Sequence, residues 1–211
     1  MPLLTSREYR VFLACAAGFG VVTLAVAAGW TAALDHSIDV LVARGRGPLL
    51  SYIAVNVTAL GSEPVAVITL IMAAAYLGLT GHGARSLWIA CPALGVLLTS
   101  LPMKDLIHHQ RPTDAIIALP ASCTYPSGHA ATAVAVWVTL ALAATRAETR
   151  PPVRRVVLGA ALVIALLVAW SRVYLGVHYF SDVVGGMLLG TALVFLCAPI
   201  GGGSRPATPA A

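Results

Sequence analysis

The stretch SRVYLGVHYFSD, Ser171 to Asp182, places an arginine, a histidine and an aspartate between two long apolar runs. The whole chain has 211 residues, of which 59% are hydrophobic and 10% charged, and its mean hydropathy is +0.88. Such a composition is too apolar for an ordinary soluble domain and predicts a membrane protein. Because a charge inside a bilayer costs about 2.5–3.5 kcal/mol on insertion scales, charges kept beside apolar runs indicate a functional site.

Six charge-free runs are long enough, with their flanking residues, to form membrane-spanning helices, which need roughly 17–25 residues. They are Val11–Trp30, Pro64–Gly81, Ser86–Met103, Ala130–Thr145, Val156–Ser171 and Val183–Ser204. We therefore predict an all-α polytopic membrane protein with six transmembrane helices, forming a single domain over residues 1–200. The tail 201–211 consists mainly of Gly, Pro, Ala and Ser and is predicted to be disordered.

The first run follows two arginines, as the core of a signal peptide does. It is longer than the usual core of roughly 7–15 residues, and no clear cleavage site follows it. We expect it to be an uncleaved first helix.

The segment from Asp35 to Ser62 lies between the first two predicted spans. Its apolar part, Gly47 to Ser62, is separated from the next span only by Glu63, which leaves no room for a hairpin between two spanning helices. We predict that this segment is partly helical and lies along the membrane interface. Ser62-Glu63-Pro64 is typical of a helix start, with Ser62 as the N-cap. A catalytic role for Glu63 stays open as the less favoured interpretation.

The distribution of basic residues predicts the orientation of the chain. With six spans and a cytoplasmic N-terminus, eight basic residues lie inside and five outside, and three of those five belong to the polar stretches described below. When those three residues are set aside, eight basic residues inside compare with two outside. This excess fits the positive-inside rule and predicts that both termini are cytoplasmic. The inside set is Arg7, Arg10, Arg85, Arg146, Arg150, Arg154, Arg155 and Arg205, and the outside set is Arg44, Arg46, Lys104, Arg111 and Arg172.

Two further polar stretches, KDLIHHQRP (Lys104 to Pro112) and PSGH (Pro126 to His129), lie between the third and fourth predicted spans. The stretch Ser171 to Asp182 lies between the fifth and sixth. Since two crossings separate these connections, all three stretches must reach the same face of the membrane. That face is predicted to be external.

Lys104 and Arg111 are seven residues apart, which is two turns if the helix continues through them. A guanidinium offers a planar fork to phosphate oxygens and an ammonium offers a compact charge, so the pair suits a phosphate. The alternative is that both side chains only anchor a helix end at the lipid headgroups. Pro112 is expected to end or bend the helix.

Ser127 and Gly128 precede the fourth span and would supply free backbone N–H groups at a helix N-terminus, which favours an anion. His129 would then lie in the first turn beside that anion, although a purely structural histidine is the alternative. Asp182 follows His178 by four residues, so its carboxylate could orient the imidazole and raise its nucleophilicity. The alternative is a solvated histidine and a helix-capping aspartate, and Asp182 could fill both roles.

The three stretches, read as Lys-x6-Arg-Pro, Pro-Ser-Gly-His and Ser-Arg-x5-His-x3-Asp, resemble the motifs of the type 2 phosphatidic acid phosphatase (PAP2) superfamily, in its bacterial membrane lipid phosphatase branch. The resemblance implies that His178 attacks phosphorus to form a phosphohistidine, that Asp182 holds its ring, and that His129 protonates the leaving group. It implies neither a cofactor nor a metal, because three cations take the place of a metal. The implied phosphate-binding residues are Lys104, Arg111, Ser127, Gly128 and Arg172.

Residues outside the matched motifs are expected to have other roles. His108, His109 and Asp114 are expected to be interfacial or adjacent to substrate. Gly186 and Gly190 form a small-xxx-small pair that would ease helix packing. The four cysteines show neither the spacing of a disulfide framework nor that of a zinc or iron–sulfur site.

The resemblance implies an integral membrane phosphatase that acts on a lipid phosphate or diphosphate. Its candidate substrates are polyprenyl diphosphate, phosphatidic acid and phosphatidylglycerophosphate, and an undecaprenyl-type diphosphate is favoured. A lipid phosphotransferase or head-group transferase is the main alternative, and a non-enzymatic lipid carrier is a weaker one. Vanadium haloperoxidases share the motifs, but six spans argue against that use. The net charge of +5 does not indicate a nucleic-acid partner, because no basic run is interleaved with aromatic residues.

Overall fold

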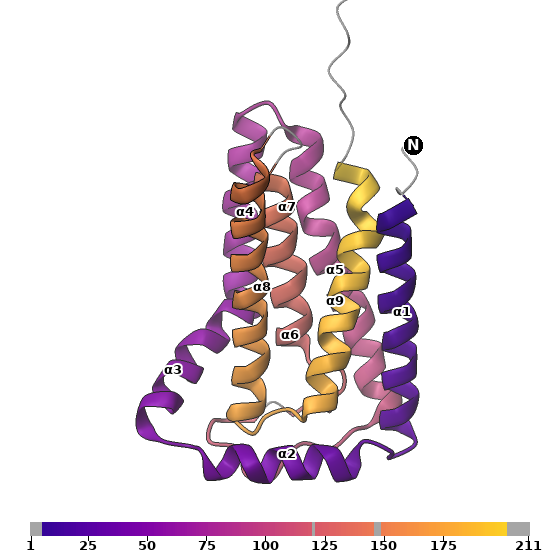
Figure 1. The fold of residues 1–211 in the computed structure, drawn as a ribbon, viewed down its shortest axis with the longest axis vertical. Coiled ribbons are helices and arrows are strands. Elements are labelled where there is room, and N and C mark those ends of the chain that lie inside the picture. The colour runs from indigo at the N-terminus through magenta and orange to yellow at the C-terminus, as the bar shows by residue number, and fades with distance from the viewer. Residues whose placement is uncertain (1–5, 120, 146–148, 202–211) are drawn as a thin grey trace, which may run out of the picture.

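Figure 1 shows a computed structural model of the chain in which long helices stand side by side and a shorter helix crosses one end. The structure describes residues 6–119, 121–145 and 149–201, and these contain helices and loops but no strand. The helices are α1 (Ser6–Ala27), α2 (Ala32–Arg44), α3 (Pro48–Thr58), a 3₁₀ turn η1 (Ala59–Gly61), α4 (Glu63–Leu79), α5 (Gly83–Ile107), α6 (Gly128–Ala133), a π-helical turn η2 (Val134–Val138), α7 (Thr139–Ala144), α8 (Pro151–Tyr174) and α9 (Phe180–Gly201).

Each of the six predicted runs coincides with a helix or with a continuous helical run. Among the described residues, four helices are long and apolar enough to cross a bilayer, namely Arg7–Ala27, Arg85–Ile107, Pro151–Tyr174 and Phe180–Ala198. The run Gly128–Ala144 is shorter, and α4 passes the same test only together with α3. The count is therefore four or five by length and composition, and six spans stay a prediction. Of the predicted tail, only Gly201 is described, and it ends α9.

The segment Gly47 to Ser62 was predicted to lie along the membrane interface. In the structure it leads into α4 as the first part of a bent helix pair. Residues Pro48–Gly61 and α4 together meet the requirements of a span, but they are bent by 50° at the break. Pro64 lies in the first turn of α4 and has no N–H to continue the helical ladder, which accounts for the break. Ser62 is the N-cap residue, as predicted, but its hydroxyl donates back to the Ala59 carbonyl at 2.7 Å instead of capping α4.

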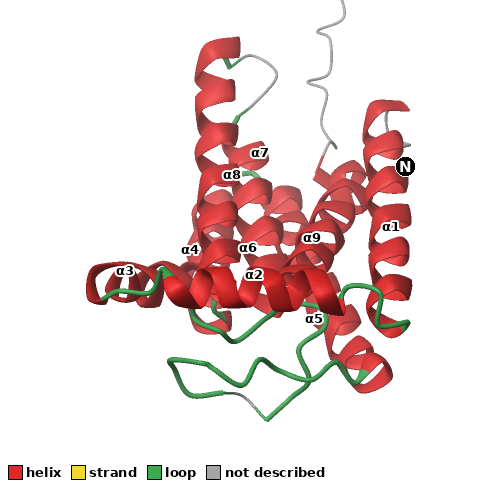
Figure 2. Cartoon of the chain, turned by 60° about the horizontal axis from the view of Figure 1, so that its bottom comes forward, coloured by secondary structure: helices red, strands yellow, loops and turns green. Residues whose placement is uncertain are grey.

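α2 lies across one end of the bundle, as Figures 1 and 2 both show. Two polar side chains connect this segment to the helices above it. The buried Asp35 carboxylate accepts the backbone N–H and the hydroxyl of Ser181, at 2.9 and 2.7 Å, in the first turn of α9. Arg46 donates to the Tyr174 carbonyl at the end of α8 at 2.9 Å and forms an ion pair with Asp114 at 2.7 Å. α2 is therefore held against the ends of α8 and α9.

α9 packs against the segment that begins α6 with very little space between the two backbones. A Cβ added to Gly190 would lie 2.5 Å from the Ala131 carbonyl oxygen, and one added to Gly186 would collide with the Ser127 carbonyl. The predicted packing role of this glycine pair is thereby confirmed. The close approach positions the PSGH stretch beside the start of α9.

The three polar stretches meet at the end of the bundle that α2 covers. α5 and α8 end there, α6 and α9 begin there, and the loop residues 108–119 and 121–127 lie over the same end (Figure 2). The Ser127 N–H donates to the Asp182 carbonyl at 3.0 Å, which connects the second stretch directly to the third. The predicted convergence of these stretches is confirmed.

Candidate active site

A cavity of about 480 Å³ opens where these stretches meet. Its polar end is lined by Lys104, Arg111, Ser122, Gly128, His129, Arg172 and His178. Its remaining wall is formed by α4 and α5 and is mostly apolar, although Glu63 at the start of α4 and Ser100 in α5 also line the cavity. The apolar side chains of this wall include Val67, Leu70, Leu94, Leu97 and Leu101. Six of the eight predicted site residues line this one cavity. Ser127 and Asp182 lie behind its surface, fully buried.

His178 and Asp182 face each other across the start of α9. The His178 Nδ1 lies 3.5 Å from the Asp182 Oδ2, so the contact is longer than a good hydrogen bond. His178 precedes α9, which begins at Phe180, so the two residues lie on either side of the helix start and not on one helical face. Its imidazole is nevertheless positioned with one nitrogen toward the carboxylate and the ring against the cavity.

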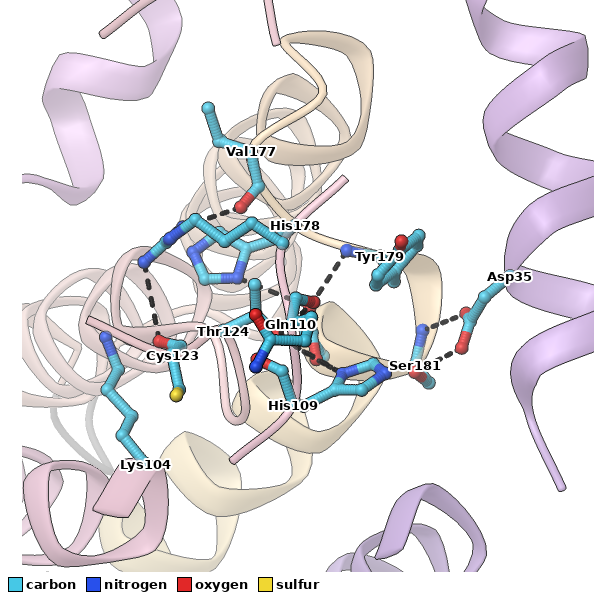
Figure 3. A network of polar contacts seen from close by, with 12 residues as sticks. Asp35, Lys104, His109, Gln110, Cys123, Thr124, Val177, His178, Tyr179 and Ser181 are labelled. Carbon is cyan, nitrogen blue, oxygen red and sulfur yellow. Dashed lines mark hydrogen bonds and ion pairs between the residues drawn. The ribbon is translucent and has the colours of Figure 1, made fainter. Parts of the chain in front are cut away.

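Asp182 has three further partners, and together they fix its carboxylate. The Tyr179 N–H donates to Oδ2 at 2.8 Å, which caps the start of α9. On Oδ1, the His109 Nδ1 lies at 2.8 Å and the Thr124 hydroxyl at 3.2 Å. Figure 3 shows His109, Thr124 and His178 gathered in this network, with Asp35 and Ser181 to one side of it. Asp182 therefore caps the start of α9 and is hydrogen-bonded to His109, and its predicted role in orienting His178 stays a prediction.

The two imidazoles beside Asp182 have opposite pKa shifts. Burial lowers the pKa of His178 to about 4, and the nearby carboxylate only partly offsets this effect. Burial is the largest single effect on the pKa of His109 and lowers it, but the hydrogen bond to Asp182 and the negative charges of Asp182 and Asp35 together outweigh it, so the pKa is raised. At neutral pH the His178 ring is therefore uncharged, as a nucleophile requires.

The cations of the first stretch reach the cavity from different local structures. Lys104 is in the last turn of α5, but the helix ends at Ile107, where His108 adopts a left-handed conformation with a φ of 50°. Arg111 is therefore in a loop, so the condition that one helix continues through both cations is not met. Pro112 therefore does not end or bend the helix as expected, because α5 already ends at Ile107. Both side chains still reach the Ser122 hydroxyl, at 3.4 Å from Lys104 and 3.3 Å from Arg111.

Arg111 also holds the loop together. Its Nε donates to the Ser122 carbonyl at 2.9 Å and its Nη1 donates to the Val177 carbonyl at 2.7 Å. The second of these bonds fixes the residue next to His178. Arg111 thus positions the backbone of the nucleophile candidate while it lines the same cavity.

Three buried polar atoms at the site have no hydrogen-bond partner among the described residues, namely the Arg172 Nε, the Ser127 Oγ and the His178 Nδ1. The Arg172 Nη1 donates to the Thr58 hydroxyl at 2.8 Å, which leaves the rest of the guanidinium facing the cavity. Since unpaired buried donors are costly, such atoms fit a site that receives an oxygen-rich anion.

The predicted residues are therefore brought together, but their network includes partners that sequence reasoning did not find. His109, Thr124 and Asp35 were not assigned to it, because their contacts to the start of α9 join residues 73, 58 and 146 positions apart. The only sequence signal for His109 was its position inside the Lys-x6-Arg stretch.

Comparison with known proteins agrees with this site. The sequence profile of the PAP2 superfamily matches residues 85–205, which is more than half of the 211 residues and contains all three stretches. The chain belongs to the PAP2 superfamily.

Curated relatives of this PAP2 protein are phosphatases. Phosphatidylglycerophosphatase B of Bacillus subtilis is 39% identical over 95 residues, covering 44% of this chain and 47% of the relative. An undecaprenyl-diphosphatase of Sulfolobus acidocaldarius is 39% identical over 89 residues, covering 42% of this chain and 39% of the relative. The chain thus spans less than half the length of these two curated relatives.

Among solved structures, a transmembrane PAP2-type phosphatidylglycerolphosphate phosphatase from Bacillus subtilis has a TM-score of 0.82 to this PAP2 protein at 26% identity. The match covers 89% of this chain and 94% of that one. The likeness therefore includes the segments before residue 85, where the family profile does not reach. A membrane PAP2 fold accounts for nearly the whole chain.

Proposed function

We propose that this protein is an integral membrane phosphatase that hydrolyses a lipid phosphate or diphosphate through a phosphohistidine intermediate. The observation that carries the proposal is the single cavity in which His178, His129, Lys104, Arg111 and Arg172 share one polar end, continuous with an apolar wall. A phosphoryl group would bind at the polar end and the lipid chain would lie along the wall.

In the first step, the His178 Nε2 lone pair attacks phosphorus and the P–O bond to the lipid breaks. His129 takes up a proton when the phosphate binds, because the negative phosphate favours the imidazolium, and it gives that proton to the leaving oxygen. The Nδ1–H of His178 points toward Asp182, whose negative charge stabilises the ring as it becomes a cationic phosphohistidine. Lys104, Arg111 and Arg172 stabilise the charge on the equatorial oxygens, together with the N–H groups near Ser127 and Gly128.

In the second step, water attacks the phosphohistidine. His129, which is now neutral, accepts a proton from that water, and the P–N bond breaks with its electron pair returning to His178. Inorganic phosphate leaves, and the His178 ring is again neutral. The cations serve both steps, since each passes through a five-coordinate phosphorus of similar charge.

The curated relatives favour two substrate classes, phosphatidylglycerophosphate and an undecaprenyl-type diphosphate. The apolar wall between α4 and α5 suits the chain of either lipid, and an undecaprenyl-type diphosphate remains our favoured substrate.

We further propose one membrane domain over residues 1–200 with six spans. In that arrangement α4 and the run Gly128–Ala144 cross as short helices of about 25 Å, against a hydrocarbon core of about 30 Å. The positive-inside distribution favours cytoplasmic termini and an external active site, with α2 at the external interface.

Phosphate release from purified protein in detergent micelles tests the proposal. Undecaprenyl diphosphate, phosphatidylglycerophosphate and phosphatidic acid would be supplied to the wild type, to His178→Ala and to His129→Ala. We expect the wild type to cleave at least one lipid and His178→Ala to lose about 1,000-fold or more in kcat. Vanadate should inhibit as a mimic of five-coordinate phosphorus. Full activity of His178→Ala would refute the phosphohistidine step.

The transferase alternative predicts a different result in the same assay. Cleavage of the lipid phosphate by the wild type would then depend on an added lipid or sugar acceptor. A phosphohistidine formed without an acceptor would persist. Prompt hydrolysis of the trapped intermediate in water alone identifies a phosphatase.

A further inference from the structure

The carboxylate that supports His178 is bonded more closely to a different histidine. The His109 Nδ1 lies 2.8 Å from the Asp182 Oδ1, whereas the His178 Nδ1 lies 3.5 Å from the Oδ2. His109 belongs to the first polar stretch but to none of its motif positions. His109 contacts the Oδ1 of Asp182 and does not line the cavity, whereas His178 faces the Oδ2 and lines it.

His109 is held at this position by its neighbours. The Thr124 N–H donates to the His109 carbonyl at 2.9 Å, and the Thr124 hydroxyl lies 3.1 Å from the His109 Nδ1. The Tyr179 ring packs against the imidazole with 5.2 Å between the ring centroids. The side chain is still 22% exposed, so its proton can exchange with water.

We propose that His109 is a positioning residue that shares the Asp182 carboxylate with the nucleophile His178 and sets how strongly that carboxylate supports it. This inference rests on the proposed function. When His109 is protonated, its charge offsets that of Asp182 and makes protonation of His178 harder. When His109 is neutral, the Nδ1–H still orients the carboxylate, but the full negative charge is available to the His178 ring.

The charges around His109 raise its pKa above the ordinary histidine value. Asp182 from α9 and Asp35 from α2 both favour the charged ring, and they oppose the cost of burial. Tyr179 and His178 face it from the turn before α9, and burial raises the pKa of the Tyr179 hydroxyl, which keeps that group uncharged. Arg111 is two residues further along the same loop.

The test compares His109→Asn, which keeps an N–H near the position of Nδ1 but does not titrate, with His109→Ala, which has no donor. His108→Asn is the matched control, since His108 is exposed on the same loop and asparagine tolerates its left-handed backbone. We expect His109→Ala to lose about 10-fold in kcat with little change in KM, and His109→Asn to stay within about 3-fold of the wild type. In the wild type, log(kcat/KM) should show an ionisation above the ordinary histidine pKa that His109→Asn lacks and His108→Asn retains.

The NMR signals of the histidine rings in ¹⁵N-labelled protein in micelles report the coupling between His109 and His178 without any substrate. The His178 signals should shift as His109 titrates in the wild type and in His108→Asn, and this shift should vanish in His109→Asn. Identical His178 titrations in all three proteins would overturn the inference, whether or not a lipid phosphate is cleaved. Coupling in a protein that cleaves no lipid phosphate would contradict only the proposed function.

Discussion

At the residue scale, the chemistry of the site depends on which partners contact each of the two oxygens of the Asp182 carboxylate. Its Oδ2 accepts the Tyr179 N–H that starts α9 and also faces His178, while its Oδ1 accepts from His109. A carboxylate bonded on both oxygens cannot rotate away from the imidazole that it orients. The 3.5 Å contact to His178 leaves room to shorten when that ring becomes positively charged.

The pKa of His178 predicts the acid limit of activity. Because burial lowers this pKa to about 4, the reactive neutral ring persists well below the usual histidine value and is lost only as the pH falls through about 4. We therefore expect kcat/KM of the His109→Asn variant, which has no titrating side chain at position 109, to decline with a midpoint near pH 4 after correction for ionisation of the substrate phosphate. Circular dichroism at each pH would confirm that the protein is still folded. A half-maximal value already at pH 6.5 would contradict a buried neutral nucleophile.

At the element scale, the glycines Gly186 and Gly190 let the PSGH segment lie close to the backbone of α9, which positions the two parts of the site beside each other. Gly186→Ala would place a methyl group against the Ser127 carbonyl, so the two backbones must separate. We expect a loss of about 1–3 kcal/mol in the free energy of unfolding and a large loss of phosphatase activity, measured by denaturant titration in micelles and by phosphate release. Gly20→Ala is the matched control, since a Cβ at that helical position meets nothing within 4 Å. If Gly186→Ala behaved like Gly20→Ala, the close packing would not be needed for the site.

The wall between α4 and α5 predicts a separation of chain binding from chemistry. Leu97 lines the cavity, whereas its neighbour Leu98 is more exposed and does not. Leu97→Trp should raise KM for a long-chain lipid phosphate about 10-fold or more while leaving cleavage of a short water-soluble phosphomonoester nearly unchanged. Leu98→Trp should affect neither. Equal losses on both substrates would show that the tryptophan disturbs the phosphate site itself.

Some of these elements follow from the sequence and others do not. Hydropathy places the apolar helices, and topology alone brings the three stretches to one face. The end of α5 at Ile107 is not predictable, because His108 is neither a glycine nor an asparagine and its left-handed conformation depends on loop contacts such as Thr124 to His109. The His109–Asp182 bond joins residues 73 positions apart, and no periodicity reports such a contact.

At the scale of the whole molecule, the active site is at one end of the bundle and the loop between α4 and α5 is at the other, so the orientation in the membrane decides which compartment supplies substrate. Thr113 is exposed in the loop over the site, and Thr80 is exposed after α4. With the four native cysteines replaced by alanine, a membrane-impermeant maleimide should label Thr113→Cys on intact cells. Thr80→Cys should react only after permeabilisation, because the excess of arginines at its end of the bundle favours the cytoplasmic side. The reverse labelling pattern would place the site in the cytoplasm, where its substrate would have to be a lipid phosphate of the inner leaflet.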